Sequence, residues 1–160
     1  MRLDLYHAET ARIATEQSAL LDVAKQCLTE GLMLTPLEQN GVLHALQVLV
    51  ENAIGKAKQL LKASGETVLI SAYDAFSSLV RLGEIEQKQL TAWNAVIGLR
   101  NRIVHDYMNI DMTRVPELVS QGRYEFVTEF YLYRLYRSQH HNYGQIRSCN
   151  LPITTPPPHF

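Results

Sequence analysis

Apolar residues recur every three or four positions along most of this chain, and that spacing places them on one face of successive α-helices. No segment alternates apolar and polar residues over a convincing length, so the pattern does not favour a β-sheet. It predicts helices over residues 9–30, 36–63, 72–83, 90–107 and 112–137. Short connections between long amphipathic helices favour antiparallel neighbours. We therefore expect an all-α protein, an up-and-down bundle of four to five helices.

Turn-forming residues mark the ends of these helices. Thr35-Pro36-Leu37-Glu38 predicts a helix start, because threonine caps the helix, proline suits its first turn and the glutamate completes a capping box. Gly31, Ser64-Gly65 and Gly83 are predicted stops. The run Thr67-Val68-Leu69-Ile70 is strand-like in composition, but we interpret it as a helix entry.

The end of the chain differs in composition from the rest. The segments His140-His141-Asn142 and Thr154-Thr155-Pro156-Pro157-Pro158 lack the periodicity of a core. The chain of 160 residues fits a single domain with a tail. We expect a helical domain over residues 1–138 and an extended or mobile tail over residues 139–160.

Charge and cysteine content exclude some classes of function. The formal net charge is −1, so any contact with RNA would need a local basic patch. No apolar run has the length of a membrane span, and Met1–His7 has no features of a signal peptide. Cys27 and Cys149 lack metal-ligand spacing, which favours two free thiols in a reducing compartment. We expect a cytoplasmic protein with no membrane contact.

The strongest candidate for chemistry is the segment from Arg100 to Tyr107, which reads Arg-Asn-Arg-Ile-Val-His-Asp-Tyr. The planar guanidinium of arginine binds phosphate through paired N–H donors, and histidine exchanges protons near neutral pH. The pair therefore points to phosphodiester chemistry. At about 100° per residue, Arg100 falls in the middle of the apolar face, with Tyr107 on the same face. Asn101 and His105 lie four residues apart, together at the edge of that face.

A guanidinium on an apolar face needs a partner, because leaving it unpaired and buried is costly. We predict Glu51 as the carboxylate that pairs with Arg100, since it lies near the inward face of its helix, one turn from Gln47. Arg102 and Asp106 lie on the opposite side, four residues apart, and are interpreted as a surface ion pair. Arg102 is also a candidate phosphate contact. A purely structural role for the arginine and histidine at a helix end stays open.

The segment Leu99–Tyr107, followed by Ile110-Asp111, resembles the HEPN superfamily and, within it, the HepT toxins with their Arg-x4-His-x-Tyr motif. Residues 45–54, 71–79 and 83–85 resemble the family's segments before that motif. The likeness covers about residues 36–135. It implies an all-helical HEPN-like fold and a homodimer in which the two motif helices build a shared cleft. It also implies metal-independent ribonuclease activity and a minimal nucleotidyltransferase antitoxin that attaches AMP to the motif tyrosine, here Tyr107.

On this hypothesis the RNA's own 2′-hydroxyl is the nucleophile, and neither a metal nor another cofactor is needed. His105 would perform acid–base catalysis, and two copies could divide the two roles. Arg100 would stabilise the negative charge on the phosphate, and Asn101 would orient His105 or donate to phosphate. AMP on Tyr107 would add bulk and negative charge at the phosphate site and so block the substrate.

Other functions receive less support. The main alternative is a non-catalytic dimeric binding subunit of a nucleotidyltransferase complex. A metal site made by His140-His141 with His7, His44 or His159 is disfavoured, because adjacent histidines suit a single ion poorly. The sequence contains neither a nucleophile elbow nor a phosphate-binding glycine loop. The class of RNA and the cleavage position stay open.

Overall fold

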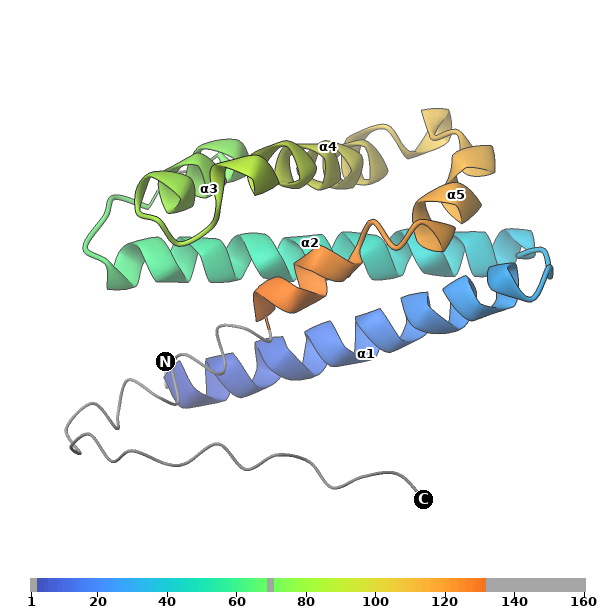
Figure 1. Ribbon diagram of the computed structural model, residues 1–160, viewed down its shortest axis with the longest axis horizontal. Helices are drawn as coiled ribbons and strands as arrows, with labels where there is room; N and C mark the ends of the chain where they lie inside the picture. The colour runs from blue at the N-terminus through green and yellow to red at the C-terminus, as the bar shows by residue number, and fades with distance from the viewer. Residues whose placement is uncertain (1–2, 69–70, 132–160) are drawn as a thin grey trace, which may run out of the picture.

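The computed structural model describes residues 3–68 and 71–131, and in these residues the chain forms helices and turns but no strand (Figure 1). The α-helices are α1 (Leu3–Thr29), α2 (Pro36–Ala63), α3 (Ala72–Arg81), α4 (Leu90–His105) and α5 (Val115–Ser120). Short 3-10 helices occupy Gln87–Gln89, Tyr107–Asn109 and Met112–Arg114, and residues 125–131 are helical again. The predicted fold class is therefore confirmed.

The long helix α2 lies at the centre of the bundle. α1 packs along one side of it, and α3 and α4 pack along the other (Figure 1). α5 contacts both α1 and α2. Successive long helices run in opposite directions, so the chain forms an up-and-down bundle around α2.

The start of α2 follows the sequence prediction. The Thr35 hydroxyl accepts a hydrogen bond from the Glu38 backbone N–H at 3.3 Å, and the Glu38 carboxylate accepts one from the Thr35 N–H at 2.7 Å. These reciprocal bonds satisfy two donors that the first turn would leave without partners. The hydrogen bond from the Thr35 backbone is also the main reason that the pKa of the Glu38 carboxyl is lowered.

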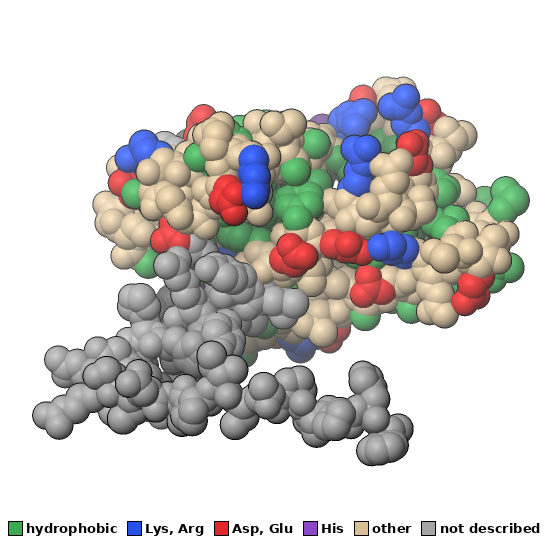
Figure 2. All heavy atoms as spheres, in the orientation of Figure 1, with side chains coloured by type: hydrophobic (Ala, Val, Ile, Leu, Met, Phe, Trp, Pro, Cys, Tyr) green, Lys and Arg blue, Asp and Glu red, His purple; other side chains and the backbone are tan. Residues whose placement is uncertain are grey.

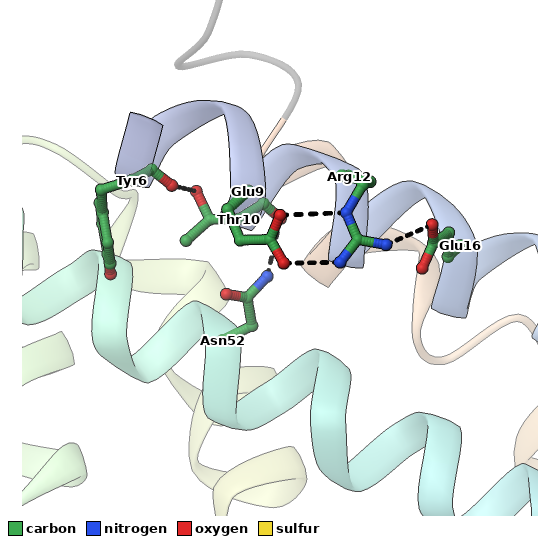
Figure 3. A network of polar contacts seen from close by, with 6 residues as sticks. All are labelled: Tyr6, Glu9, Thr10, Arg12, Glu16 and Asn52. Atoms are coloured by element: carbon green, nitrogen blue, oxygen red, sulfur yellow. Dashed lines mark hydrogen bonds and ion pairs between the residues drawn. The ribbon is translucent and has the colours of Figure 1, made fainter. Parts of the chain in front are cut away.

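α1 begins at Leu3, six residues before the predicted start. Figure 3 shows the contacts near this end of the helix. The Thr10 hydroxyl donates to the Tyr6 carbonyl at 3.0 Å, and Asn52 of α2 donates to the Thr10 carbonyl at 2.8 Å. A Cβ placed on Gly55 would lie 3.3 Å from the Tyr6 hydroxyl oxygen, so the first turns of α1 pack closely on α2. Contacts with α2 therefore hold the first turns of α1, which lie before the predicted start at residue 9.

Aromatic side chains fill the core between α3, α4 and the C-terminal part of the described chain. Trp93 is 1% exposed and stacks on Phe76 with 4.1 Å between ring centroids. Phe126 and Phe130 each form an edge-to-face pair with Trp93, with 5.0 and 5.1 Å between ring centroids. Such edge-to-face and stacked contacts fix the orientation of the rings and also bury apolar area. Because Trp93 lies in the first half of α4, these contacts hold that half of the helix in the core.

The predicted helix over residues 112–137 is wrong as a single element. α5 ends at Ser120, and Gly122 adopts φ +62°, a conformation that L side chains disfavour. Its N–H bonds to the Val119 carbonyl at 2.9 Å, and the Arg123 N–H bonds to the Leu118 carbonyl at 3.3 Å. These bonds close the helix end in the manner of a glycine C-cap.

Several predictions fall wholly or partly outside the described residues. Thr67 and Val68 are neither helix nor strand, and Leu69 and Ile70 are not described. Residues 132–160 are also not described, and they include the predicted boundary after residue 138, the predicted tail and Cys149. Cys27 forms no disulfide with any described residue. Over the ranges 3–68 and 71–131, no helix has the length and apolar character of a membrane span.

Candidate functional site

α4 carries the Arg-x4-His segment and is fixed by its buried face. Trp93 and Ile97 are 1% and 0% exposed, and Ile103 is also buried. Arg100 lies three residues after Ile97 and therefore faces α2, as the helical spacing predicted.

Arg100 and Glu51 form a half-buried ion pair between α4 and α2. The Glu51 Oε1 atom accepts hydrogen bonds from Arg100 Nε at 3.1 Å and from Arg100 Nη2 at 2.9 Å. Gln47 Nε2 donates to the same oxygen at 3.1 Å. The side chains of Arg100 and Glu51 are 27% and 37% exposed. The pairing predicted from the sequence is present, and Gln47 supports it.

Asn101 contacts Arg100. Its Oδ1 atom accepts a hydrogen bond from Arg100 Nη1 at 3.1 Å. Among the described residues no hydrogen bond joins Asn101 to His105. The expected roles of Asn101, to orient His105 or to donate to phosphate, stay predictions, and both would use its amide N–H groups. Asn101 and Glu51 together hold three of the five N–H donors of Arg100.

His105 is the last residue of α4 and is exposed. No described residue forms a hydrogen bond with its imidazole. The neighbouring Val104, placed on the inward face by the helical spacing, is 41% exposed. Near the end of α4, Ile103 is thus still buried, whereas Val104 is largely open to solvent.

Tyr107 does not share a face with Arg100, and that prediction is wrong. α4 ends at His105, Asp106 has φ −141°, and Tyr107 begins a 3-10 turn. Asn109 donates a side-chain hydrogen bond to Asp106, a local contact that competes with helix continuation. The Tyr107 hydroxyl instead donates to Asn40 Oδ1 of α2, and the residue is 47% exposed.

Arg102 lies on the other side of α4 and is exposed. No ion pair joins it to Asp106 in the described part of the chain, so the predicted surface pair is wrong. Asp106 is engaged by Asn109. Arg102 lines a separate hollow together with Arg114 and Arg123, and Figure 2 shows arginine and lysine side chains gathered over α5 and the end of α4.

Two open pockets flank the segment. A pocket of about 450 Å³ lies between α2, the start of α3 and α4, and its walls include Arg100, Asn101, Glu51, Lys58, Ser71 and Tyr73. A second, of about 360 Å³, is lined by Tyr107 with Asn40 and Met108. The structure thus separates the arginine from the tyrosine of the motif.

The sequence analysis missed Lys58 and Tyr73. Lys58 follows Glu51 by seven residues, a spacing that places both side chains on one face of α2, so the lysine was detectable. Tyr73 comes from α3, and its approach depends on how the helices pack. Among the described residues no three His, Cys, Asp or Glu side chains gather as a metal site, and His140, His141 and His159 are not described.

Comparison with known proteins identifies similar sequences and folds. Residues 13–131 match the family model described as Ribonuclease HepT-like. No curated protein matches the chain. The fold is similar to that in a crystal structure of a toxin–antitoxin with AMP-PNP, with TM-score 0.65 and 18% identity over 79% of this chain and 97% of the other. It is also similar to a tri-AMPylated HEPN toxin of Shewanella oneidensis in complex with MNT antitoxin, with TM-score 0.64 and 20% identity over 78% and 95% of the two chains.

Proposed function

This chain belongs to the HepT-like ribonuclease family, and on that premise we propose that it is a metal-independent endoribonuclease, the toxin of a toxin–antitoxin pair. The observation that carries the proposal is the position of Arg100. Its guanidinium is held by Glu51 and Asn101 at the wall of an open pocket, and His105 follows five residues later on the same helix.

Arg100 is suited to bind a phosphate group. A guanidinium carries five N–H donors in a rigid fork. Glu51 and Asn101 use three of them, which leaves two that a phosphate can engage. The half-buried carboxylate also fixes the plane of the fork, so little side-chain entropy is lost when the phosphate binds.

His105 would supply the proton transfers. One imidazole takes the proton from the RNA 2′-hydroxyl as that oxygen attacks the adjacent phosphorus. The bond from phosphorus to the 5′-oxygen breaks, and the leaving oxygen receives a proton from an imidazolium, which we assign to the partner subunit's His105. The products carry a 2′,3′-cyclic phosphate and a 5′-hydroxyl.

A homodimer would bring the two imidazoles together. In a single chain His105 is exposed, and its sequence neighbours Val104, Tyr107 and Met108 are 41%, 47% and 91% exposed. Apolar surface of this kind is commonly covered in oligomers. A second copy placed against it would bury the apolar side chains and enclose His105 in a shared cleft.

Silencing would occur at Tyr107 by transfer of AMP from a nucleotidyltransferase antitoxin. The similar HEPN toxin of Shewanella oneidensis is tri-AMPylated and bound to MNT antitoxin. In this chain Tyr107 is accessible and lies two residues from His105. The added phosphate and adenosine would therefore obstruct the His105 side of the cleft by bulk and by negative charge, and they would not occupy the Arg100 pocket directly.

Cleavage of RNA by the purified protein in the presence of EDTA tests this function. Wild-type protein should produce fragments with 2′,3′-cyclic phosphate ends. Arg100→Ala protein, purified in the same way, should produce none, which controls for a contaminating nuclease. Binding of RNA or of the antitoxin without any cleavage would favour the non-catalytic binding subunit.

A further inference from the structure

The pocket beside Arg100 has room for much more than the phosphate group that Arg100 would bind. Its volume of about 450 Å³ falls in the range of roughly 300–1,000 Å³ typical of small-ligand sites. Three elements form it, since α3 and α4 both pack on α2 (Figure 1). Lys58 comes from α2 and Tyr73 from the first turn of α3.

Charge in this pocket favours an anion. Arg100 and Lys58 are cationic and Glu51 is anionic, so the lining side chains carry one excess positive charge. The Glu51 Oε1 atom already accepts three N–H groups from Arg100 and Gln47, so its charge is largely compensated. The start of α3 also lines the pocket at Ser71 and Tyr73, and the first N–H groups of a helix attract phosphate.

Tyr73 adds an accessible aromatic surface to the same wall. The residue is 39% exposed. A Cβ placed on Gly98 would lie 3.4 Å from the Tyr73 hydroxyl oxygen, so the tyrosine lies close to the helix that carries Arg100. An exposed ring beside cationic side chains is the combination that binds single-stranded RNA, because a base stacks on the ring and a cationic side chain binds the phosphate.

We propose that this pocket binds one nucleotide of the RNA adjacent to the scissile phosphate, with its base stacked on Tyr73 and its phosphate held by Lys58. The assignment rests on the proposed ribonuclease function, because it extends the substrate from the phosphate at Arg100. A base paired within a duplex cannot stack on Tyr73. The substrate is therefore a single-stranded segment or loop.

Binding is measured apart from cleavage. The His105→Ala protein is titrated with a fluorescently labelled 2′-O-methyl oligoribonucleotide, which lacks the attacking hydroxyl, and anisotropy is followed at several salt concentrations. Tyr73→Ala in this background should raise the Kd by about 5- to 150-fold, the effect of losing one stacked base. Lys58→Met should lower the slope of log affinity against log salt by about 0.7, the share of one phosphate on a single strand.

Two matched variants control for charge and folding. Lys62→Met removes the same charge one turn further along α2, from an exposed side chain outside the pocket, and should leave the slope unchanged. Tyr73→Phe keeps the ring and should keep the affinity. Equal slope changes for Lys58→Met and Lys62→Met would overturn the proposal, as would an unchanged Kd for Tyr73→Ala.

Cleavage assays separate this proposal from the function on which it rests. If wild-type protein cleaves RNA and the KM is unchanged by Tyr73→Ala and Lys58→Met, the nuclease stands and the nucleotide pocket is wrong. If wild-type protein leaves RNA intact but binding still depends on both residues, the nuclease is wrong and the nucleotide pocket stands.

Discussion

The two ends of the Arg-x4-His-x-Tyr segment differ in how much of their surroundings a single chain supplies. At Arg100 the chain provides a carboxylate, an amide oxygen and a pocket wall, and the side chain is 27% exposed. At His105 and Tyr107 the described residues provide one side-chain hydrogen bond, from Tyr107 to Asn40, and both residues are exposed. The arginine is therefore preorganised within one chain, whereas the histidine is left open.

On the proposed function, this contrast indicates where a second molecule would act. A phosphate site can be built in advance because an ion pair between α2 and α4 fixes the arginine. An exposed imidazole has no fixed partner for a proton transfer and no protection from bulk water. On the proposed function, the second copy completes the histidine end, and the antitoxin modifies that same end.

The largest effect should follow removal of the imidazole. His105→Ala should reduce kcat/KM for RNA cleavage by roughly 10²–10⁴-fold, the usual contribution of a positioned acid or base. The Tm should stay within error, because no described residue bonds to that side chain. His44→Ala, at an exposed position of α2, is the matched control and should retain wild-type kcat/KM. Retained cleavage by the His105 variant would remove the histidine end from the mechanism.

The next effect concerns the apolar surface beside His105. Val104→Asp should convert a dimer to a monomer, because a carboxylate buried in an apolar interface is costly, and cleavage should fall with dimer content. Light scattering during gel filtration measures the mass. Leu20→Asp, at a 59% exposed position of α1, should leave the mass unchanged. A wild-type monomer that is fully active would show that one chain suffices.

Breaking the ion pair should have a smaller effect on both stability and activity. Glu51→Gln leaves Arg100 without its carboxylate and should lower the free energy of unfolding by about 1 kcal/mol, a value reduced by the partial exposure of both side chains. Cleavage should fall because the guanidinium loses its fixed plane. Glu9→Gln, in the exposed pair with Arg12, is the stability control and should have little effect on the free energy of unfolding, because water screens such a pair. Denaturant titration measures the free energy of unfolding of both variants.

The smallest effect on the fold should come from Tyr107. Tyr107→Phe removes the hydrogen bond to Asn40 at an exposed site and should change the free energy of unfolding by less than about 1 kcal/mol. It should abolish the AMP-sized mass increase after incubation with the cognate nucleotidyltransferase, ATP and magnesium. Mass spectrometry of Tyr73→Phe protein, which keeps Tyr107, is the control. Undiminished modification of the Tyr107 variant would place the AMP elsewhere.

Local signals were sufficient for much of the fold. The capping box at Thr35 and Glu38 was predicted because its donors and acceptors lie three residues apart in the chain. The break at Gly122 is also local, since a glycine with positive φ ends the helix, and the sequence analysis missed it by following apolar spacing alone. Helical spacing placed Arg100 correctly and Tyr107 wrongly, because the period applies only as far as the helix continues.

Local sequence patterns specify the succession of amphipathic helices and the side of α4 that faces the core, because both depend on residues within one or two turns of each other. The sequence also indicated that Arg100 needs a partner, because a half-buried charge is costly wherever it lies. Which surfaces meet could be seen only in the folded chain. The distance from Arg100 to Glu51, the exposure of His105 and the approach of Tyr73 to Gly98 depend on helix packing, which joins residues far apart in the chain.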